Sequence, residues 1–175
     1  MRKRFFIVLV CVAYTLTVAL PAFAAEDVQG LWKIIDDKTK EARGFVVLYL
    51  HEGRLYGRMV ATIDEKTGLI KDTLENRTDR ADKLAGEPFY AGLDFVYRLE
   101  DKGKEWKGQI LDTESGDGYN CRLWLEGDRL VVRGQLKGLA FLGRNQTWVR
   151  ALEEELGGVV LPDPRSFVPV IPRRK

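Results

Sequence analysis

The side chains that most often carry catalysis or bind metals are scarce in this chain. It has one histidine, His51, and two cysteines, Cys11 and Cys121, among 175 residues. A multi-histidine metal centre, a zinc site or a disulfide framework needs more of these ligands than the sequence supplies. His51 lies in an expected hairpin turn, and no G-x-S-x-G or similar nucleophile motif accompanies it. We therefore predict no catalytic residues, no metal site, no cofactor and no enzymatic activity.

Two groups of neighbouring carboxylates are the remaining candidates for acid–base chemistry. They are Asp36-Asp37 and Asp112-Thr113-Glu114. A general acid–base pair has this appearance in a sequence, but carboxylates also favour turns because they accept local backbone hydrogen bonds. We expect a turn at both places. An enzyme would need a pocket that joins Asp94, Asp112 or His51 to a strong hydrogen-bond donor.

The aromatic residues are the more informative side chains. Each of the four tryptophans falls on a different expected strand, and such rings either build a core or line a pocket. Gly30-Leu31-Trp32 begins the first expected strand, and Arg144 and Arg150 lie on the last. In a closed barrel these strands are neighbours, so one of the two guanidinium groups would stack over Trp32 and close that end. We predict that the ligand-lining residues are Trp32, Tyr56, Trp106, Tyr119, Arg144 and Trp148.

Short apolar segments alternate with polar turns throughout residues 28–150, which is typical of a chain of strands. The turns are too short for helical crossovers and suit antiparallel hairpins. Within 118–126, Tyr119, Cys121, Leu123 and Leu125 share one face, and polar residues dominate the other. This pattern predicts an all-β fold, an antiparallel up-and-down β-barrel of about eight strands, although strand count alone does not exclude a sandwich. The expected strands are 28–35, 43–51, 54–62, 92–100, 105–111, 118–126, 129–137 and 144–151.

Two segments depart from this pattern. The charged stretch 63–91, after the third strand, lacks strand periodicity, and Thr78 to Leu84 suits one or two helical turns. A connection this long is either a solvated loop over one barrel end or a lid over a cavity mouth. After Glu155 come Gly157-Gly158 and then four prolines, so we expect an extended tail over 153–175. The tail either packs along the barrel or docks on a protein partner of the cell envelope.

The N-terminus has the features of a secretory signal peptide. Arg2-Lys3-Arg4 precedes an apolar run over 5–20, and Ala22-Phe23-Ala24 has the small residues of a cleavage site. The run is shorter than the ~20 residues of a spanning helix. We predict cleavage after Ala24, a periplasmic or secreted location, no transmembrane segment in the mature protein, and a barrel domain over 25–152.

Removal of the signal peptide changes the sign of the net charge. The whole chain has 28 basic and 26 acidic residues, and the three basic residues that leave give 28 − 3 = 25 against 26, or −1. A nucleic-acid partner is therefore not expected, because no net basic domain remains. Cys121 is the single cysteine left, which excludes an intramolecular disulfide.

Several segments resemble known families. Gly30-Leu31-Trp32 resembles the G-x-W opening of lipocalins and other calycin barrels. Further segments have the order and spacing seen in an uncharacterised bacterial secreted family: Leu55-Tyr56-Gly57, Ala91-Gly92-Leu93-Asp94, Gly108 to Gly116, Tyr119, Cys121-Arg122-Leu123, Leu130 to Gly134 and Leu142 to Trp148. That family is known as domain of unknown function 2147, and the resemblance covers about residues 28–150.

This resemblance implies a secreted or periplasmic barrel-like domain with no known reaction. Members of the family often carry a Cys-x-x-Cys pair before the Gly-Leu segment, whereas residues 73–80 of this chain contain no cysteine. A disulfide or metal role tied to that pair is therefore absent here.

The predicted function is the binding of a small hydrophobic or amphipathic ligand by a secreted or periplasmic barrel. The alternative is an interaction or structural module of the envelope with a filled barrel, which works through its outer face, the 63–91 segment or the tail. Whether the barrel interior is hollow or packed distinguishes the two.

Overall fold

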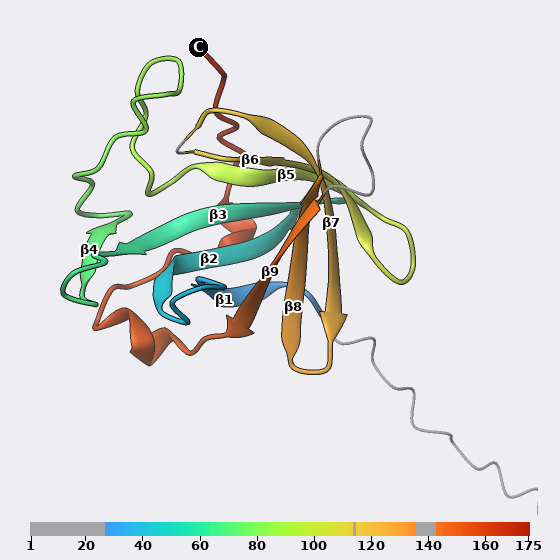
Figure 1. Cartoon of the computed structure of the whole chain (residues 1–175), viewed down its shortest axis with the longest axis horizontal. Helices are drawn as coiled ribbons and strands as arrows, with labels where there is room; N and C mark the ends of the chain where they lie inside the picture. The colour runs from blue at the N-terminus through green and yellow to red at the C-terminus, as the bar shows by residue number, and fades with distance from the viewer. Residues whose placement is uncertain (1–26, 114, 136–142) are drawn as a thin grey trace, which may run out of the picture.

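The computed structural model describes residues 27–113, 115–135 and 143–175 (Figure 1). The predicted signal peptide and its cleavage site lie outside these residues. Within them, no helix has the length and apolar character needed to cross a bilayer. Two short 3-10 helices follow the last strand, η1 (Glu153–Leu156) and η2 (Pro164–Ser166). The strands are β1 (Gly30–Ile35), β2 (Ala42–His51), β3 (Arg54–Ile63), β4 (Ile70–Thr73), β5 (Asp94–Asp101), β6 (Trp106–Leu111), β7 (Gly118–Glu126), β8 (Arg129–Gln135) and β9 (Gly143–Arg150).

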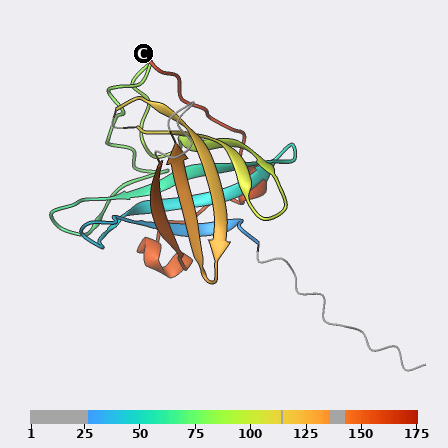
Figure 2. The same cartoon turned by 45° about the vertical axis from the view of Figure 1, so that its right-hand side comes forward.

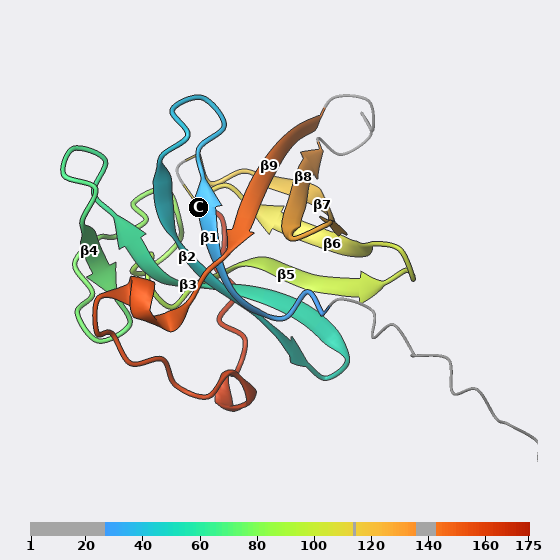
Figure 3. The same ribbon diagram turned by 90° about the horizontal axis from the view of Figure 1, so that it is seen from below.

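The strands form a closed antiparallel barrel. The order β2-β1-β9-β8-β7-β6-β5-β3 is closed by pairing between β2 and β3, and β4 extends β3 outside the ring, so eight of nine strands close the barrel. Figure 2 brings the long β7–β8 hairpin forward, and Figure 3 shows the strands from below. The predicted all-β, up-and-down barrel is confirmed. Because the paired strands form a ring, the sandwich alternative is excluded.

A bulge in β5 shows why the barrel needs a glycine on β6. The β5–β6 register shifts between Tyr97 and Glu100, and Arg98 there has a φ of 56°. The bulge pushes the backbone of β5 toward β6, and a Cβ at Gly108 would lie 2.8 Å from the Arg98 carbonyl oxygen. A side chain does not fit at that distance, so glycine permits the close approach of the two strands.

The half of the barrel interior nearest the β2–β3 and β7–β8 hairpins is filled by side chains. They form one apolar cluster, and its largest members have no exposed surface or almost none: Trp32, Leu48, Leu55, Leu99, Leu123, Leu130 and Trp148. They come from strands all around the ring, as expected for inward positions that alternate with outward ones. We call this half the closed half, and the opposite end, with the β1–β2 loop, the open end.

The structure corrects the expectation for residues 63–91. Ile70–Thr73 forms β4, and Thr78 to Leu84 forms no helical turn; Arg80 makes a β-bridge to Phe89 instead. The reason is the buried carboxylate of Asp72, which accepts hydrogen bonds from the backbone N–H groups of Thr78 and Ala91 and folds the segment back. Ala81 and Leu84 are fully buried in a small cluster with Leu93 and Leu111. Much of the 63–91 segment is therefore ordered and packed against the barrel.

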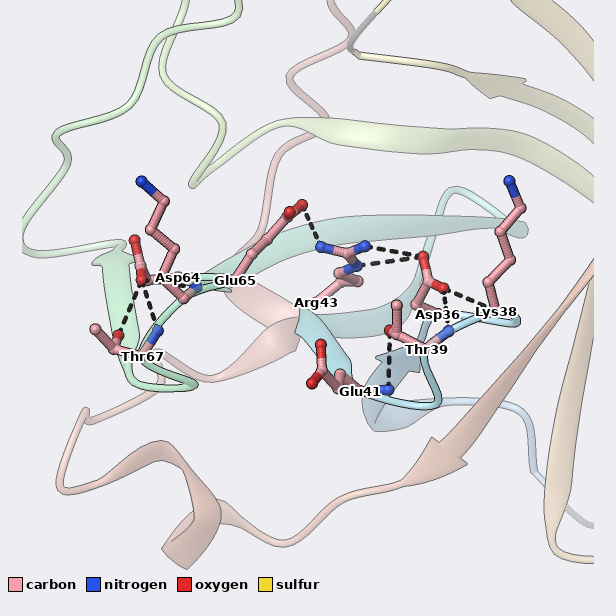
Figure 4. A network of polar contacts seen from close by, with 9 residues as sticks. Asp36, Lys38, Thr39, Glu41, Arg43, Asp64, Glu65 and Thr67 are labelled. Atoms are coloured by element: carbon pink, nitrogen blue, oxygen red, sulfur yellow. Dashed lines mark hydrogen bonds and ion pairs between the residues drawn. The ribbon is translucent and has the colours of Figure 1, made fainter.

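Two loops at the open end use the same turn (Figure 4). The carboxylates of Asp36 and Asp64 each accept hydrogen bonds from the backbone N–H groups two and three residues later. Arg43 forms ion pairs with Asp36 and Glu65 and so joins the two loops. The backbone N–H groups of Thr39 and Lys38, together with Arg43, hold the pKa of Asp36 well below its ordinary value. The predicted turn at Asp36-Asp37 is confirmed.

The second predicted carboxylate turn has the same design. Asp112 accepts backbone hydrogen bonds from Ser115 at its side chain and from Gly116 at its carbonyl oxygen. Such local bonds are the ordinary reason for an aspartate at the start of a turn. Neither carboxylate group therefore needs an acid–base role to account for its sequence.

Candidate functional site

The closed half ends at Trp32. Its indole donates a hydrogen bond to the Val28 carbonyl oxygen over 2.8 Å, and the guanidinium of Arg150 lies 4.2 Å from its ring centroid. Arg150 also donates to the carbonyl oxygens of Gln29 and Asp27. The predicted stacking on Trp32 is confirmed for Arg150, whereas Arg144 lies exposed near the other end of β9. The contact closes this end of the barrel.

Replacement of Arg150 by alanine is expected to lower the free energy of unfolding by about 1–2 kcal/mol, because a stacked, hydrogen-bonded cation at the barrel end is lost. Arg144→Ala removes an arginine of the same strand from an exposed position, so a change within about 0.5 kcal/mol is expected. Urea unfolding curves followed by tryptophan fluorescence measure both. Equal stabilities of the two variants would contradict the role of Arg150.

The open end differs from the closed half in its inward-facing side chains. Met59 and Ile110 pack on the interior cluster but are only half-buried, and Tyr119 and Gln146 are half-buried beside them. The Oε1 atom of Gln146 accepts a hydrogen bond from the Trp148 indole over 3.1 Å. Beneath them lie the rings of Phe95 and Trp148, with centroids 6.0 Å apart. Two apolar side chains, a phenol and an amide are therefore partly accessible at the open end, and the two rings are buried. These inward positions form the candidate functional site, which consists of Met59, Phe95, Ile110, Tyr119, Gly134, Gln146 and Trp148.

The predicted ligand-lining residues do not share one surface. Trp32 belongs to the filled closed half, and Trp106 is half-buried against the same cluster. Tyr56 lies on the outer face of β3, where its ring stacks on Tyr49 at 5.8 Å, because its neighbours Leu55 and Gly57 hold the inward positions. Arg144 is exposed. Of the predicted set, Tyr119 lies at the open end, as does Arg144, which pairs with Gly134 there. Trp148 is fully buried where the packed half meets the open end.

The structure also separates the residues that an enzyme would need to combine. His51 lies at the β2–β3 hairpin in the closed half, whereas Asp94 and Asp112 lie at the opposite end of the barrel. Asp94 is fully buried in an ion pair with Arg58, and Asp112 lies in the turn described above. Across residues 27–113, 115–135 and 143–175, no three His, Cys, Asp or Glu side chains group as a metal site would require.

Cys121 lies in the interior cluster, as its position on the apolar face of β7 predicts. Burial raises the pKa of its thiol from 9.0 to about 12. A thiol in this state is unreactive at neutral pH, since the thiolate is the nucleophile. The cysteine therefore acts as a small apolar core residue.

The raised pKa of Cys121 predicts a loss of stability at alkaline pH. From its ordinary value of 9.0 up to about 12, the unfolded thiol loses its proton while the folded thiol keeps it. The folded state then binds more protons, so the free energy of unfolding falls as pH rises through this range. Urea unfolding curves between these pH values measure it, and Cys121→Ala should flatten the decline. An equal decline in both proteins would contradict the prediction.

The sequence analysis missed a buried polar cluster on the outer side of the barrel. Asp94 accepts hydrogen bonds from Tyr49 Oη at 2.8 Å and from Arg58 Nη2 at 2.7 Å. It also accepts one from the Val170 backbone N–H at 2.6 Å, and Arg58 donates to the Val168 carbonyl oxygen at 2.6 Å. Burial and the Asp94 carboxylate raise the pKa of Tyr49 above its ordinary value. We call Tyr49, Arg58 and Asp94 the clamp, because they bind the C-terminal tail.

The tail packs along the barrel from η1 to the open end (Figure 3). Leu156 and Phe167 are buried on the outer face of β2 and β3, and the Phe167 ring meets Tyr49 edge-on at 5.2 Å. The sequence left open whether the tail packs along the barrel or docks on a partner, and in the structure it packs along its own barrel. One sequence signal was available: residues 45–49 are apolar or aromatic at every position, which indicates a strand covered on both faces.

Comparison with known proteins places the barrel in a family. Residues 30–150 match the family model described as "Uncharacterized protein conserved in bacteria (DUF2147)". The chain belongs to this family. The match spans β1 to β9 and excludes the tail. A DUF2147 barrel is therefore the unit that this protein shares with its relatives, and no curated protein matches the chain.

Among solved structures, the chain is similar to a protein of Helicobacter pylori. Its title reads "Protein HP1028 from the human pathogen Helicobacter pylori belongs to the lipocalin family". The similarity has a TM-score of 0.60 at 17% identity and covers 75% of this chain and 87% of that one. At this identity the likeness concerns the fold: this DUF2147 barrel is lipocalin-like.

Proposed function

We propose that the protein is a periplasmic or secreted binding protein without enzymatic activity, which takes a small hydrophobic or amphipathic ligand at the open end of its barrel. The observation that carries this proposal is the change in burial along the interior. Most inward side chains in the closed half, among them Trp32, Leu55 and Leu130, have no exposed surface, and Trp106 and Leu125 at its rim are half-buried. At the open end Met59, Ile110, Tyr119 and Gln146 all remain partly accessible.

The chemistry of these side chains suits such a ligand. Met59 and Ile110 offer accessible apolar surface packed on the cluster that holds the buried rings of Phe95 and Trp148, and the Tyr119 hydroxyl and the Gln146 amide offer polar contacts. Small-molecule sites generally combine apolar walls with a few polar groups that fix orientation. The filled closed half limits the depth of the site, so the ligand is expected to be small. The predicted signal peptide supports the location, and the lipocalin-like fold supports ligand binding.

The test uses a variant that occupies the open end. Gly134 is an inward position, since a Cβ there would lie 3.7 Å from Ile110 and 3.9 Å from Tyr119, which is ordinary contact. Gly134→Phe should therefore fold and fill the site. The probe is 1-anilinonaphthalene-8-sulfonate, whose fluorescence reports an apolar environment. We expect the affinity for the probe to fall about tenfold or more. A tenfold loss corresponds to about 1.4 kcal/mol, which is about the free energy of burying one apolar side chain.

The control places the same ring outside the barrel. Asn120 is exposed on the polar outer face of β7, so Asn120→Phe should leave probe binding unchanged. Native mass spectrometry of the protein from its own host should also show a bound small molecule. A protein that is ligand-free and binds no probe would overturn the proposal and leave the interaction module as the function to test.

A further inference from the structure

A groove of ≈550 Å³ lies outside the barrel, between the segment 74–93 and the C-terminal tail. One wall comes from residues 74–93, the other from the tail between Pro162 and Val170, and Arg58 lies at its base. The volume falls within the range of small-molecule sites. The groove is on the clamp side of β3, so the barrel wall separates it from the open-end interior.

The groove is lined largely by apolar and aromatic side chains. Pro88, Phe89 and Leu93 contribute from the 74–93 segment, and Phe167 and Val170 contribute from the tail. The two rings are held in place by arginines: Arg80 lies 4.1 Å from the centroid of Phe89, and Arg58 lies 4.5 Å from that of Phe167. Val170 retains 51% of its surface exposed, so the tail covers the clamp but leaves apolar surface facing outward.

The positive charge within the groove comes from two arginines with different surroundings. Arg58 is neutralised by the buried carboxylate of Asp94 at 2.7 Å. Arg77 has no ion pair with any carboxylate in the described part of the chain, and its one hydrogen bond there runs from Nε to the Leu74 carbonyl oxygen at 3.0 Å. That bond leaves both Nη groups available to a ligand.

Arg77 is held by its bond to Leu74 and lies over the space that Gly92 leaves open. A Cβ at Gly92 would lie 3.4 Å from Cζ of Arg77 and 3.5 Å from each Nη atom, so the guanidinium plane lies flat over this glycine. Gly92 has a φ of 102°, a backbone conformation in which a residue with a side chain would be strained. The Nε bond to Leu74 thus orients a planar fork that lies over Gly92, and such a fork matches the two oxygens of a carboxylate.

We infer that this groove is a second ligand site, which binds an amphipathic carboxylate, with the acid group on Arg77 and the apolar part along Phe89 and Phe167. Glu75 also lines the groove, is exposed, and opposes the ligand charge. Loss of Arg77 and loss of Glu75 should therefore change affinity in opposite directions. The site is independent of the open-end ligand of the proposed function.

The test measures binding of decanoate, a linear carboxylate, to the full mature chain by isothermal titration calorimetry below its micelle concentration. Arg77→Gln should weaken binding about tenfold or more, because a hydrogen bond to a charged group contributes about that factor to affinity. Glu75→Gln should tighten binding about two- to fivefold, because a like charge is removed. Decanol, which lacks the charge, should bind the wild type and Arg77→Gln equally. Both replaced side chains are exposed, so unchanged melting temperatures should show that each variant is folded.

Arg54→Gln is the matched control, because Arg54 is an exposed arginine at the other end of β3. It makes the same change in net charge and should leave decanoate binding unchanged. Equal losses in Arg77→Gln and Arg54→Gln would overturn the inference, as would equal affinities for decanoate and decanol. Loss of decanoate binding in Gly134→Phe but not in Arg77→Gln would place the ligand in the barrel and overturn this site while supporting the proposed function.

Discussion

Asp94→Ala is expected to lower the free energy of unfolding by about 3–5 kcal/mol, the usual cost of removing one partner of a buried ion pair. The carboxylate has no exposed surface and accepts hydrogen bonds from Tyr49, Arg58 and the Val170 backbone. Without it, the Arg58 charge remains largely buried with no carboxylate partner. Urea unfolding followed by tryptophan fluorescence measures the loss.

Two further variants separate the ion pair from a general effect of removing an aspartate. Asp128→Ala changes an exposed aspartate in the β7–β8 turn, and a change within about 0.5 kcal/mol is expected. The double variant Arg58→Met with Asp94→Leu should recover part of the stability, because no buried charge is then left unpaired. A loss below about 1 kcal/mol in Asp94→Ala would show that the clamp contributes little to the fold.

Deletion of residues 158–175 is expected to destabilise the barrel by at least about 3 kcal/mol. Burial of a phenylalanine such as Phe167 contributes about 1.5–3 kcal/mol, and an unsatisfied buried polar group costs about 1–3 kcal/mol more. Both effects apply, because the clamp loses its bonds to Val168 and Val170 and the outer face of β2 and β3 becomes exposed. The truncated chain should also bind more 1-anilinonaphthalene-8-sulfonate.

A shorter deletion provides the control for the truncation. Residues 172–175 form surface ion pairs, Arg174 with Asp117 and Lys175 with Glu87. Exposed pairs of this kind contribute little. The four residues also form a β-bridge from Arg174 to Leu84, in which the Ala85 N–H donates to the Arg173 carbonyl oxygen, so their removal should cost no more than about 2 kcal/mol. If the long truncation unfolded at the same urea concentration as the full chain, the tail would be an accessory segment, available for a partner.

Much of the barrel could be predicted because the information is local. The alternation of apolar and polar residues has a period of two and reports directly which face of a strand is buried. All eight expected strands of the ring exist, with ends within two residues of those observed. The stacking of Arg150 on Trp32 also followed from chain order, since an up-and-down barrel must bring its first and last strands together.

The candidate site was harder to predict, because the same residue types serve opposite purposes. Trp32 and Trp106 pack in the interior cluster, while Trp148 lies where the packed region meets the open end. No periodic pattern distinguishes a core tryptophan from one at a mouth, because both occupy inward positions. Burial depends on what the other strands place at the same level of the barrel. The error for Tyr56 has a simpler cause: both faces of β3 are apolar there.

By itself, the amino-acid sequence determined the strands, their inward faces, the closed barrel and the end at which Trp32 lies, because these depend on residues that are neighbours along the chain or on strand order. The tertiary structure alone decided that the tail covers β2 and β3 and that Arg77 faces a groove. It also decided that Arg58 and Asp94 form hydrogen bonds with tail residues that lie 110 and 76 positions away in the sequence. Contacts over such distances depend on the three-dimensional path of irregular segments. That path carries no repeating signal, because it is set by individual hydrogen bonds such as those of Asp72 and Asp94.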